Sequence, residues 1–356
     1  MKIGMLSPLY ESCPPKLYGG TERVVDNLCK GLSELGHEVV LFASNDSTTK
    51  ATLVPVVPQA LRLANPPIEQ DLPYITLQLA KVMEQVAEFD VVHNHIDFYS
   101  YPHIDSSPCP WLTTLHGRLD YPDLQLLYKH YKHLPLASIS YAQRKPLSFC
   151  NWLANVYHGL DVEMFKPRFK KGKYLAFLGR ICEDKGTHVA IEIAKRTGIP
   201  LKIAAKIGPH DKEFFESKIK HHIDGKLIEF IGEITEAEKS DFLSNALALL
   251  TPIDWPEPFG LVVIESYACG TPVVGRPCGS LPEIIEEGKT GFLRNSLDDL
   301  TAAVNQVETL DRNYIRNFAK ENFSYQIMAA KYVNLYKDLI HLREGKKPYI
   351  VRPSAA

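Results

Sequence analysis

The sequence predicts an α/β protein with two doubly wound domains in tandem, each built around a parallel sheet. Its 356 residues are enough for two domains of ordinary size, each with a core of its own. In both halves, apolar runs of strand length alternate with stretches of helical periodicity. This alternation is typical of parallel strands joined by crossover helices.

The first domain is expected over residues 1–165 and begins with a buried strand at 2–8. Apolar residues then recur at helical spacing until Gly36, and residues 37–43 supply the second strand. Further strands are expected at 89–94, 111–115, 137–139 and 153–157, with a helix at 81–87 and no clear element in the proline-rich residues 51–72.

A basic segment separates the two halves and contains Lys166, Arg168, Lys170, Lys171 and Lys173. Such a cluster is compatible with a nucleic-acid or membrane patch. A solvated linker between domains is favoured, because runs of charge usually lie in water.

The second domain is expected over residues 172–324, where the alternation resumes. Strands are expected at 174–178, 201–207, 227–231, 247–252 and 272–275, and helices at 188–197, 212–223, 237–246, 282–287 and 297–310. A last amphipathic helix is expected to begin at residue 325.

The composition, 45% hydrophobic and 23% charged, is that of a soluble globular protein. A formal charge of −2 argues against a general nucleic-acid binder. The seven cysteines show no paired spacing, and neither a secretory leader nor an apolar run of membrane length is found. We therefore expect a cytoplasmic protein with free thiols and no transmembrane segment.

The most informative stretch runs from a buried strand near residue 250 to a helix that begins near Phe259. Gly260 falls at the helix start, where free backbone amides favour an anion such as phosphate. Glu257 precedes this start and Glu265 lies about two turns inside the helix. Two carboxylates at this spacing also occur by chance, so an ordinary strand–turn–helix unit is the alternative.

The wider context makes this stretch more specific. Glu257-Pro258-Phe259-Gly260, followed by Glu265 and by the run from Ala268 to Val274, resembles the signature of the retaining family 4 glycosyltransferases. That family has the GT-B fold, in which two Rossmann-like domains face each other across a cleft. The resemblance also implies that the last helix, residues 325–345, crosses back to the N-terminal domain.

The resemblance covers nearly the whole chain and is dense over residues 174–293. The segment Tyr157-His158-Gly159 departs from the more usual Pro-Asn-Gly, which puts local sugar or hinge contacts in doubt.

The resemblance assigns donor-binding roles in the second domain. It implies that Glu257 holds hydroxyls of the donor sugar and that Glu265 binds the ribose. It also implies that backbone amides at Phe259, Gly260 and Leu261 meet phosphate. A further acidic residue at a predicted strand end, Glu233, is expected to border the base.

Two cations, Arg180 and Lys185, follow the first strand of the second domain. Fixed positive charges there would stabilise the diphosphate as it departs. Loop charges on the surface are an equal alternative without the resemblance, which assigns both residues to the diphosphate. In the first domain, Gly19 and Gly20 precede a helix and resemble the family's diphosphate-binding glycine pair, although a simple turn has the same pattern.

Three histidines lie at predicted strand ends. His116 resembles the family's contact to the donor sugar, although a lone histidine is more often structural. His93 and His95 have the spacing of two metal ligands, but no third ligand accompanies them, so lining or structural roles are favoured and no metal site is expected.

The resemblance implies a retaining transferase that moves a hexose from a UDP- or GDP-linked donor to an acceptor without metal or cofactor. The acceptor, whether glycan, lipid-linked or small molecule, is not identified by the sequence. The alternatives are another GT-B enzyme, such as an epimerase or phosphorylase, and a non-catalytic nucleotide-sugar-binding module. We find no placed carboxylate pair for a retaining glycosidase and no pyridoxal lysine for a phosphorylase.

Overall fold

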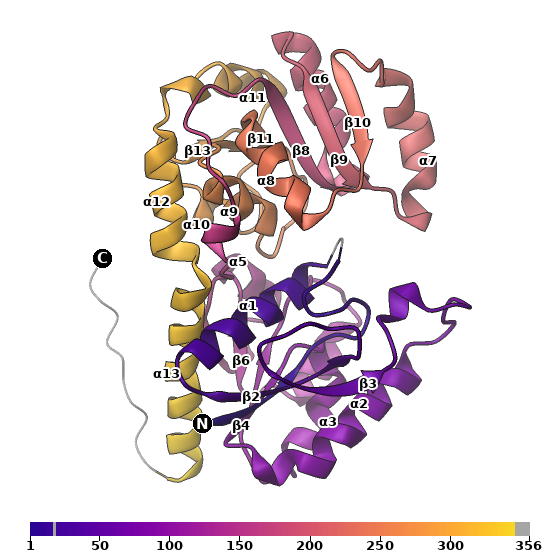
Figure 1. Ribbon diagram of the computed structural model, residues 1–356, viewed down its shortest axis with the longest axis vertical. Helices are drawn as coiled ribbons and strands as arrows, with labels where there is room; N and C mark the ends of the chain where they lie inside the picture. The colour runs from indigo at the N-terminus through magenta and orange to yellow at the C-terminus, as the bar shows by residue number, and fades with distance from the viewer. Residues whose placement is uncertain (17–18, 346–356) are drawn as a thin grey trace. The chain divides into compact units, whose positions relative to one another are not determined.

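The computed structural model describes residues 1–16 and 19–345, which form two compact α/β units (Figure 1). Of the described residues, unit 1 comprises 1–16, 19–139, 144–159 and 325–345. Unit 2 comprises residues 140–143 and 160–324. Each unit is built on a parallel sheet in which the strand order reverses once, as in doubly wound folds. This confirms the predicted fold class.

The sheet of unit 1 has seven parallel strands in the order β3-β2-β1-β4-β5-β6-β7. These strands are β1 (Lys2–Leu6), β2 (Glu38–Ser44), β3 (Thr52–Val57), β4 (Val91–Asn94), β5 (Trp111–Thr114), β6 (Leu136–Ser138) and β7 (Trp152–Asn155). The winding reverses between β1 and β4, where Met5 pairs with Leu41 on one side and with His93 on the other. In folds of this kind, ligands bind beyond the carboxyl ends of the strands at such a reversal.

Helices cover the sheet of unit 1 and contribute to its hydrophobic core. They are α1 (Gly20–Glu34), α2 (Leu72–Gln85), α3 (Tyr101–Ile104), α4 (Leu124–His130) and α13 (Tyr325–Arg343), with α5 (Tyr141–Arg144) shared between the units.

The last helix, α13, runs alongside α1 although the two are far apart in sequence (Figure 1). A Cβ at Gly31 would lie 2.7 Å from the Cβ of Ala329, so the absence of a side chain there allows the close approach. The hydroxyl of Tyr325 donates to Glu34 at 2.8 Å, and Lys30 lies over the Tyr325 ring. The C-terminal helix is therefore an integral part of unit 1.

The sheet of unit 2 has six parallel strands in the order β10-β9-β8-β11-β12-β13. These strands are β8 (Tyr174–Arg180), β9 (Leu201–Lys206), β10 (Ile228–Gly232), β11 (Ala246–Thr251), β12 (Val273–Gly275) and β13 (Gly291–Leu293). The helices are α6 (Thr187–Thr197), α7 (Lys212–Phe214), α8 (Glu236–Ser244), α9 (Leu261–Ala268), α10 (Leu281–Ile284), α11 (Leu297–Val304) and α12 (Arg312–Phe323). Here the winding reverses between β8 and β11.

Several elements differ from the sequence predictions. The continuous helix expected over 212–223 is wrong: a single α turn is followed by a π turn at Phe215–Ile219 and a 3-10 turn at Lys220–His222. Strands β3 and β13 and helix α12 were not predicted. β13 has three residues and pairs with β12 alone, so its local pattern is too short to indicate a strand.

Across residues 1–16 and 19–345, we find no helix with both the length and the apolar character needed to cross a membrane.

Candidate functional site

The loops that follow β8 and β11 meet at the carboxyl edge of the unit 2 sheet. These strands are neighbours at the reversal of winding, so their following loops start side by side. The amide of Asp254 donates to the carbonyl of Asp184 at 2.9 Å and joins the two loops. Gly186 has a φ of +72°, and a Cβ there would clash with the carbonyl of Pro252. Only glycine suits both the backbone conformation and the close approach.

Lys185 and Glu257 form an ion pair between these two loops. The Lys185 ammonium bonds Oε2 of Glu257 and lies 4.8 Å from the centre of the Trp255 ring. The Lys185 and Glu257 side chains are 22% and 12% exposed, so both are mostly buried but remain accessible to a ligand. The structure thus brings two of the predicted site residues into direct contact.

The backbone of Glu257 is held from two sides. Its amide donates to the carbonyl of Trp255 at 2.7 Å, and its carbonyl accepts from the amide of Ser280 at 2.9 Å. Gly279 has a φ of +57°, and a Cβ there would clash with the Glu257 backbone. The carboxylate therefore projects from a rigid turn.

Arg180, the last residue of β8, lies at the same edge. Its Nε is 3.4 Å from Oδ2 of Asp211, in the loop after β9, and its side chain is half exposed. A partly exposed pair of this length contributes little stability, so a stronger anion can replace the carboxylate at low cost. Arg180 and Lys185 thus each have an exchangeable acidic partner.

Helix α9 begins beside Glu257. Gly260 is its N-cap with a φ of +84°, and no side chain caps this end. The first backbone amides of the helix, including that of Leu261, are therefore available to an anion. Phe259 has its ring buried against Phe323, so a ligand can meet its backbone but not its side chain.

Glu265 lies inside α9 and is 3% exposed. Its Oε1 accepts from the Lys239 ammonium at 2.8 Å, and that ammonium is also 3.2 Å from Glu236. The other oxygen of Glu265, Oε2, is buried without a hydrogen-bond partner among the described residues. A capping box between Thr235 and Glu238 holds the start of α8, which carries Lys239.

Lys239 is a site residue that the sequence did not predict. Its local pattern indicates only an exposed helix position with an acidic neighbour, and its partner Glu265 lies 26 residues further along the chain.

Glu233 is separated from the other predicted residues of unit 2. It is exposed and follows β10, the edge strand, whereas Arg180 and Glu257 follow the central strands β8 and β11.

In unit 1, Gly19 and Gly20 stand at the start of α1, which follows the central strand β1. Gly19 is the N-cap, and no side chain caps the helix. A Cβ at Gly19 would lie 2.7 Å from Pro15 and 3.0 Å from Glu11, so the loop is packed tightly on itself.

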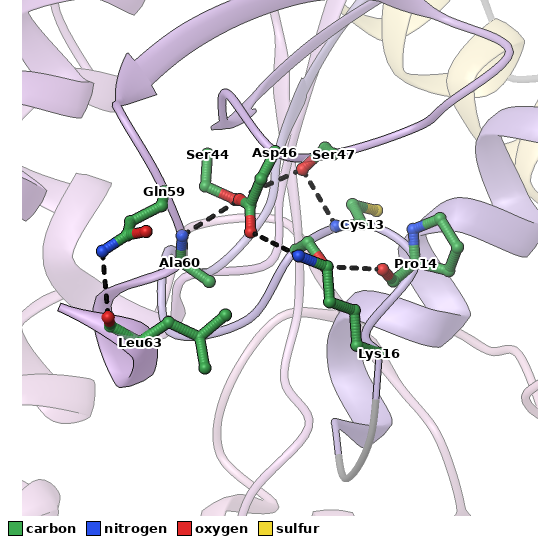
Figure 2. A network of polar contacts seen from close by, with 10 residues as sticks. Cys13, Pro14, Lys16, Ser44, Asp46, Ser47, Gln59, Ala60 and Leu63 are labelled. Atoms are coloured by element: carbon green, nitrogen blue, oxygen red, sulfur yellow. Dashed lines mark hydrogen bonds and ion pairs between the residues drawn. The ribbon is translucent and has the colours of Figure 1, made fainter. Parts of the chain in front are cut away.

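The loop before these glycines is anchored to the segment after β2, as Figure 2 shows. The amide of Cys13 donates to Oγ of Ser47 at 2.9 Å. Asp46 accepts from the amide of Ala60 at 3.0 Å and lies 3.5 Å from the ammonium of Lys16. These contacts hold the described residues of the loop in a defined conformation beside the helix start.

The predicted residue His116, which is half-buried, belongs to a column of four imidazoles. The other three are buried and belong to His93 in β4, His95 after β4 and His158 after β7. Ring centres are 4.0 Å apart for His93 and His95, 5.0 Å for His95 and His116, and 5.1 Å for His116 and His158, whose rings are stacked. Burial lowers the pKa of all four and brings that of His116 to about 3. The column is therefore uncharged at neutral pH.

His93 has a structural role within this column. Its two ring nitrogens are 2.7 Å from the hydroxyl of Tyr336 and 2.8 Å from that of Thr114, so both are engaged. Among residues 1–16 and 19–345, no three His, Cys, Asp or Glu side chains are grouped to hold a metal ion.

Comparison with known proteins gives matches along both units. Residues 18–156 match the family model described as Glycosyltransferase Family 4, and residues 161–322 match the model described as Glycosyl transferases group 1. The chain is 24% identical to N-acetyl-alpha-D-glucosaminyl L-malate synthase of Bacillus anthracis, over 97% of this chain and 98% of that protein.

Solved structures show the same fold. AviGT4, a glycosyltransferase involved in avilamycin A biosynthesis, matches with a TM-score of 0.73 and 24% identity over 95% of this chain and 98% of that one. HepE of Anabaena, in complex with UDP and glucose, matches with a TM-score of 0.72 and 17% identity over 94% of this chain and 99% of that one. Two doubly wound units in one chain are thus shared with glycosyltransferases over nearly the full length.

Proposed function

We propose that this chain, which belongs to the family 4-like glycosyltransferases of the GT-B fold, transfers a hexose from a UDP- or GDP-linked donor with retention of configuration. The acceptor supplies a hydroxyl group, and neither a metal ion nor a cofactor takes part.

The Lys185–Glu257 ion pair beside the uncapped start of α9 carries the proposal. An ammonium, a carboxylate and free helix amides lie at the reversal point of a doubly wound sheet, where ligands bind in such folds. Without donor, Lys185 and Glu257 neutralise each other. When the donor binds, its diphosphate forms ion pairs with Lys185 and Arg180. Glu257 then accepts hydrogen bonds from hydroxyls of the sugar.

The remaining contacts are assigned in the same way. The unpartnered Oε2 of Glu265 accepts from a ribose hydroxyl, while the backbone amides at Gly260 and Leu261 bind phosphate oxygens. Gly19 and Gly20 allow the diphosphate to approach the start of α1, and His116 bonds a hydroxyl of the sugar. Glu233 is the weakest assignment, because it stands at the edge of the sheet.

The chemical step needs no protein nucleophile. The bond from the anomeric carbon to the leaving phosphate breaks as the acceptor oxygen attacks the same face of the sugar. The departing phosphate oxygen takes the acceptor proton, so the products are the glycoside and a nucleoside diphosphate. Arg180 and Lys185 stabilise the negative charge that develops on the diphosphate, more in the transition state than in the ground state.

A donor screen tests the proposal. The purified chain is incubated with UDP-glucose or GDP-mannose and a panel of sugar, lipid-linked and small-molecule acceptors, and the release of nucleoside diphosphate is measured. Binding of a nucleotide sugar should also raise the Tm by mass action. If Glu257→Gln and Arg180→Ala both kept full transfer, the site assignment would be wrong.

The same screen separates the alternatives. A non-catalytic binding module would show the rise in Tm without any release of nucleoside diphosphate on addition of acceptor. An epimerase would convert the donor without acceptor. Full activity in EDTA is expected, and a loss restored by Mg²⁺ or Mn²⁺ would contradict the metal-independent step. A cytoplasmic location remains a prediction.

A further inference from the structure

His95 and His116 form a directly bonded imidazole pair in unit 1. Nδ1 of His95 lies 2.7 Å from Nε2 of His116. The outer nitrogen of each ring, Nε2 of His95 and Nδ1 of His116, is buried and has no hydrogen-bond partner among the described residues. Buried polar atoms in proteins are nearly always satisfied, so two such atoms on one bonded pair suggest a place for a ligand.

The tautomers of the two rings are coupled. One of the facing nitrogens must carry the bridging proton and the other must accept it. If His95 donates, its outer nitrogen is an acceptor and the outer nitrogen of His116 carries a proton. If His116 donates, these two roles are exchanged. A neutral pair therefore offers one donor and one acceptor at its two ends, and each ring determines the other.

The neighbours of the pair hold both rings in place. His158 stacks on His116, and His93 packs on His95 at 4.0 Å between ring centres. His93 is in turn bonded to Tyr336 of α13. Rotation of either ring of the pair is thus restricted, and the hydrogen bond between them couples the tautomer of one ring to that of the other.

We propose that His95 is a positioning residue that sets the tautomer of His116, and so decides whether Nδ1 of His116 donates to or accepts from a hydroxyl of the bound sugar. This rests on the proposed function, in which His116 contacts the donor sugar. His95 itself does not touch the ligand in this proposal; it acts through the hydrogen bond to His116.

The first test needs no variant and no activity. ¹⁵N NMR of the histidine-labelled chain without ligand distinguishes protonated from unprotonated ring nitrogens. The expected result is that one, and not both, of Nδ1 of His116 and Nε2 of His95 carries a proton. Two protonated or two unprotonated outer nitrogens would overturn the coupling.

The second test uses two amides of different reach. In His95→Asn the amide stands near the former Nδ1 and keeps a hydrogen bond to His116, since it can either donate or accept. In His95→Gln the amide extends toward the former Nε2 instead. We expect His95→Asn to stay within about threefold of the parent kcat/KM for UDP-glucose or GDP-mannose. We expect His95→Gln to lose about tenfold, the effect of one hydrogen bond. The NMR spectrum of His95→Gln should show His116 as a mixture of tautomers.

The outcomes are distinguishable. Retention by Gln with loss by Asn would mean that His95 meets the ligand directly and would overturn the proposal. Equal activity of both variants, or an unchanged His116 tautomer in His95→Gln, would overturn it as well. If the parent chain transfers no sugar, the proposed function fails, while the NMR result still decides the coupling of His95 and His116.

Discussion

The two units place different chemistry at the same edge of their sheets. In unit 1 the imidazoles of His93, His95, His116 and His158 are neutral, buried or half-buried, and packed ring against ring. In unit 2 the side chains after β8 and β11 are charged and held in ion pairs that remain partly exposed. The imidazole column is rigid and carries no charge. Each ion pair, in contrast, can exchange its acidic partner for an anionic ligand.

This difference suggests a division of work between the units. Charged groups with replaceable partners suit a diphosphate, because ion pairs with the diphosphate replace those that are lost within the protein. Neutral donors and acceptors in a dry environment suit the hydroxyls of a sugar, because an ion there would pay a desolvation cost.

The largest effect is expected from Glu257→Gln. The amide keeps the size of the side chain but loses the charge that pairs with Lys185 and that we propose accepts hydrogen bonds from the sugar. We expect kcat to fall roughly 100-fold, as for the loss of one preorganised polar group in an active site, in a steady-state assay of nucleoside diphosphate release. Glu192→Gln, on the exposed pair with Arg196 in α6, is the matched control and should keep full activity.

Arg180→Ala comes next. Removal of one of two cations should lower kcat about tenfold, and Arg180→Lys should recover part of it, because the charge returns without the bidentate geometry. Arg196→Ala serves as the control. An unchanged kcat in Arg180→Ala would show that unit 2 does not bind the leaving group through this residue.

Lys239→Met tests the buried ion pair of unit 2. It leaves the Glu265 carboxylate buried without its cation, which should lower the free energy of unfolding by roughly 3 kcal/mol. The double variant with Glu265→Gln should recover most of this stability, since the charge is gone, but should bind UDP or GDP more weakly than the parent. Urea unfolding and calorimetry measure the two effects, and tight nucleotide binding by the double variant would exclude Glu265 from the ribose.

The pH dependence of stability tests the neutral column of unit 1. Histidines with a pKa lowered in the folded state bind fewer protons there than in the unfolded chain. The free energy of unfolding should therefore fall as the pH drops below 6.5, on the order of 1 kcal/mol per pH unit for each histidine. The fall ends at the pKa of the folded state, which is about 3 for His116.

His158→Phe isolates this effect, because a stacked ring is kept and one titrating group is lost. Glu22, whose pKa burial raises to about 7, acts in the opposite direction, so the variant must be compared with its parent at each pH. The slope below pH 6.5 should become smaller in His158→Phe and stay unchanged in the exposed control His133→Gln. An equal slope in parent and His158→Phe would contradict a neutral column.

Much of the fold follows from local pattern. The alternation of apolar runs and helical periodicity indicates both parallel sheets, and the glycine before Leu261 marks the start of α9 within one or two residues. The order Glu257, Gly260, Glu265 is local too, because one turn and one helix carry all three. Neighbours along the chain determine these features, so the sequence is sufficient for them.

What the sequence alone determined is therefore the class of fold and which residues stand at strand ends and helix starts. The tertiary structure alone decided their partners: Lys239 with Glu265 across 26 residues and His95 with His116 across 21. It also decided that α13 packs on α1 and that short β13 is a strand at all. A local pattern reflects backbone geometry, whereas an ion pair or a bonded imidazole pair depends on which strands become neighbours in the sheet, and that order is set when the whole unit packs.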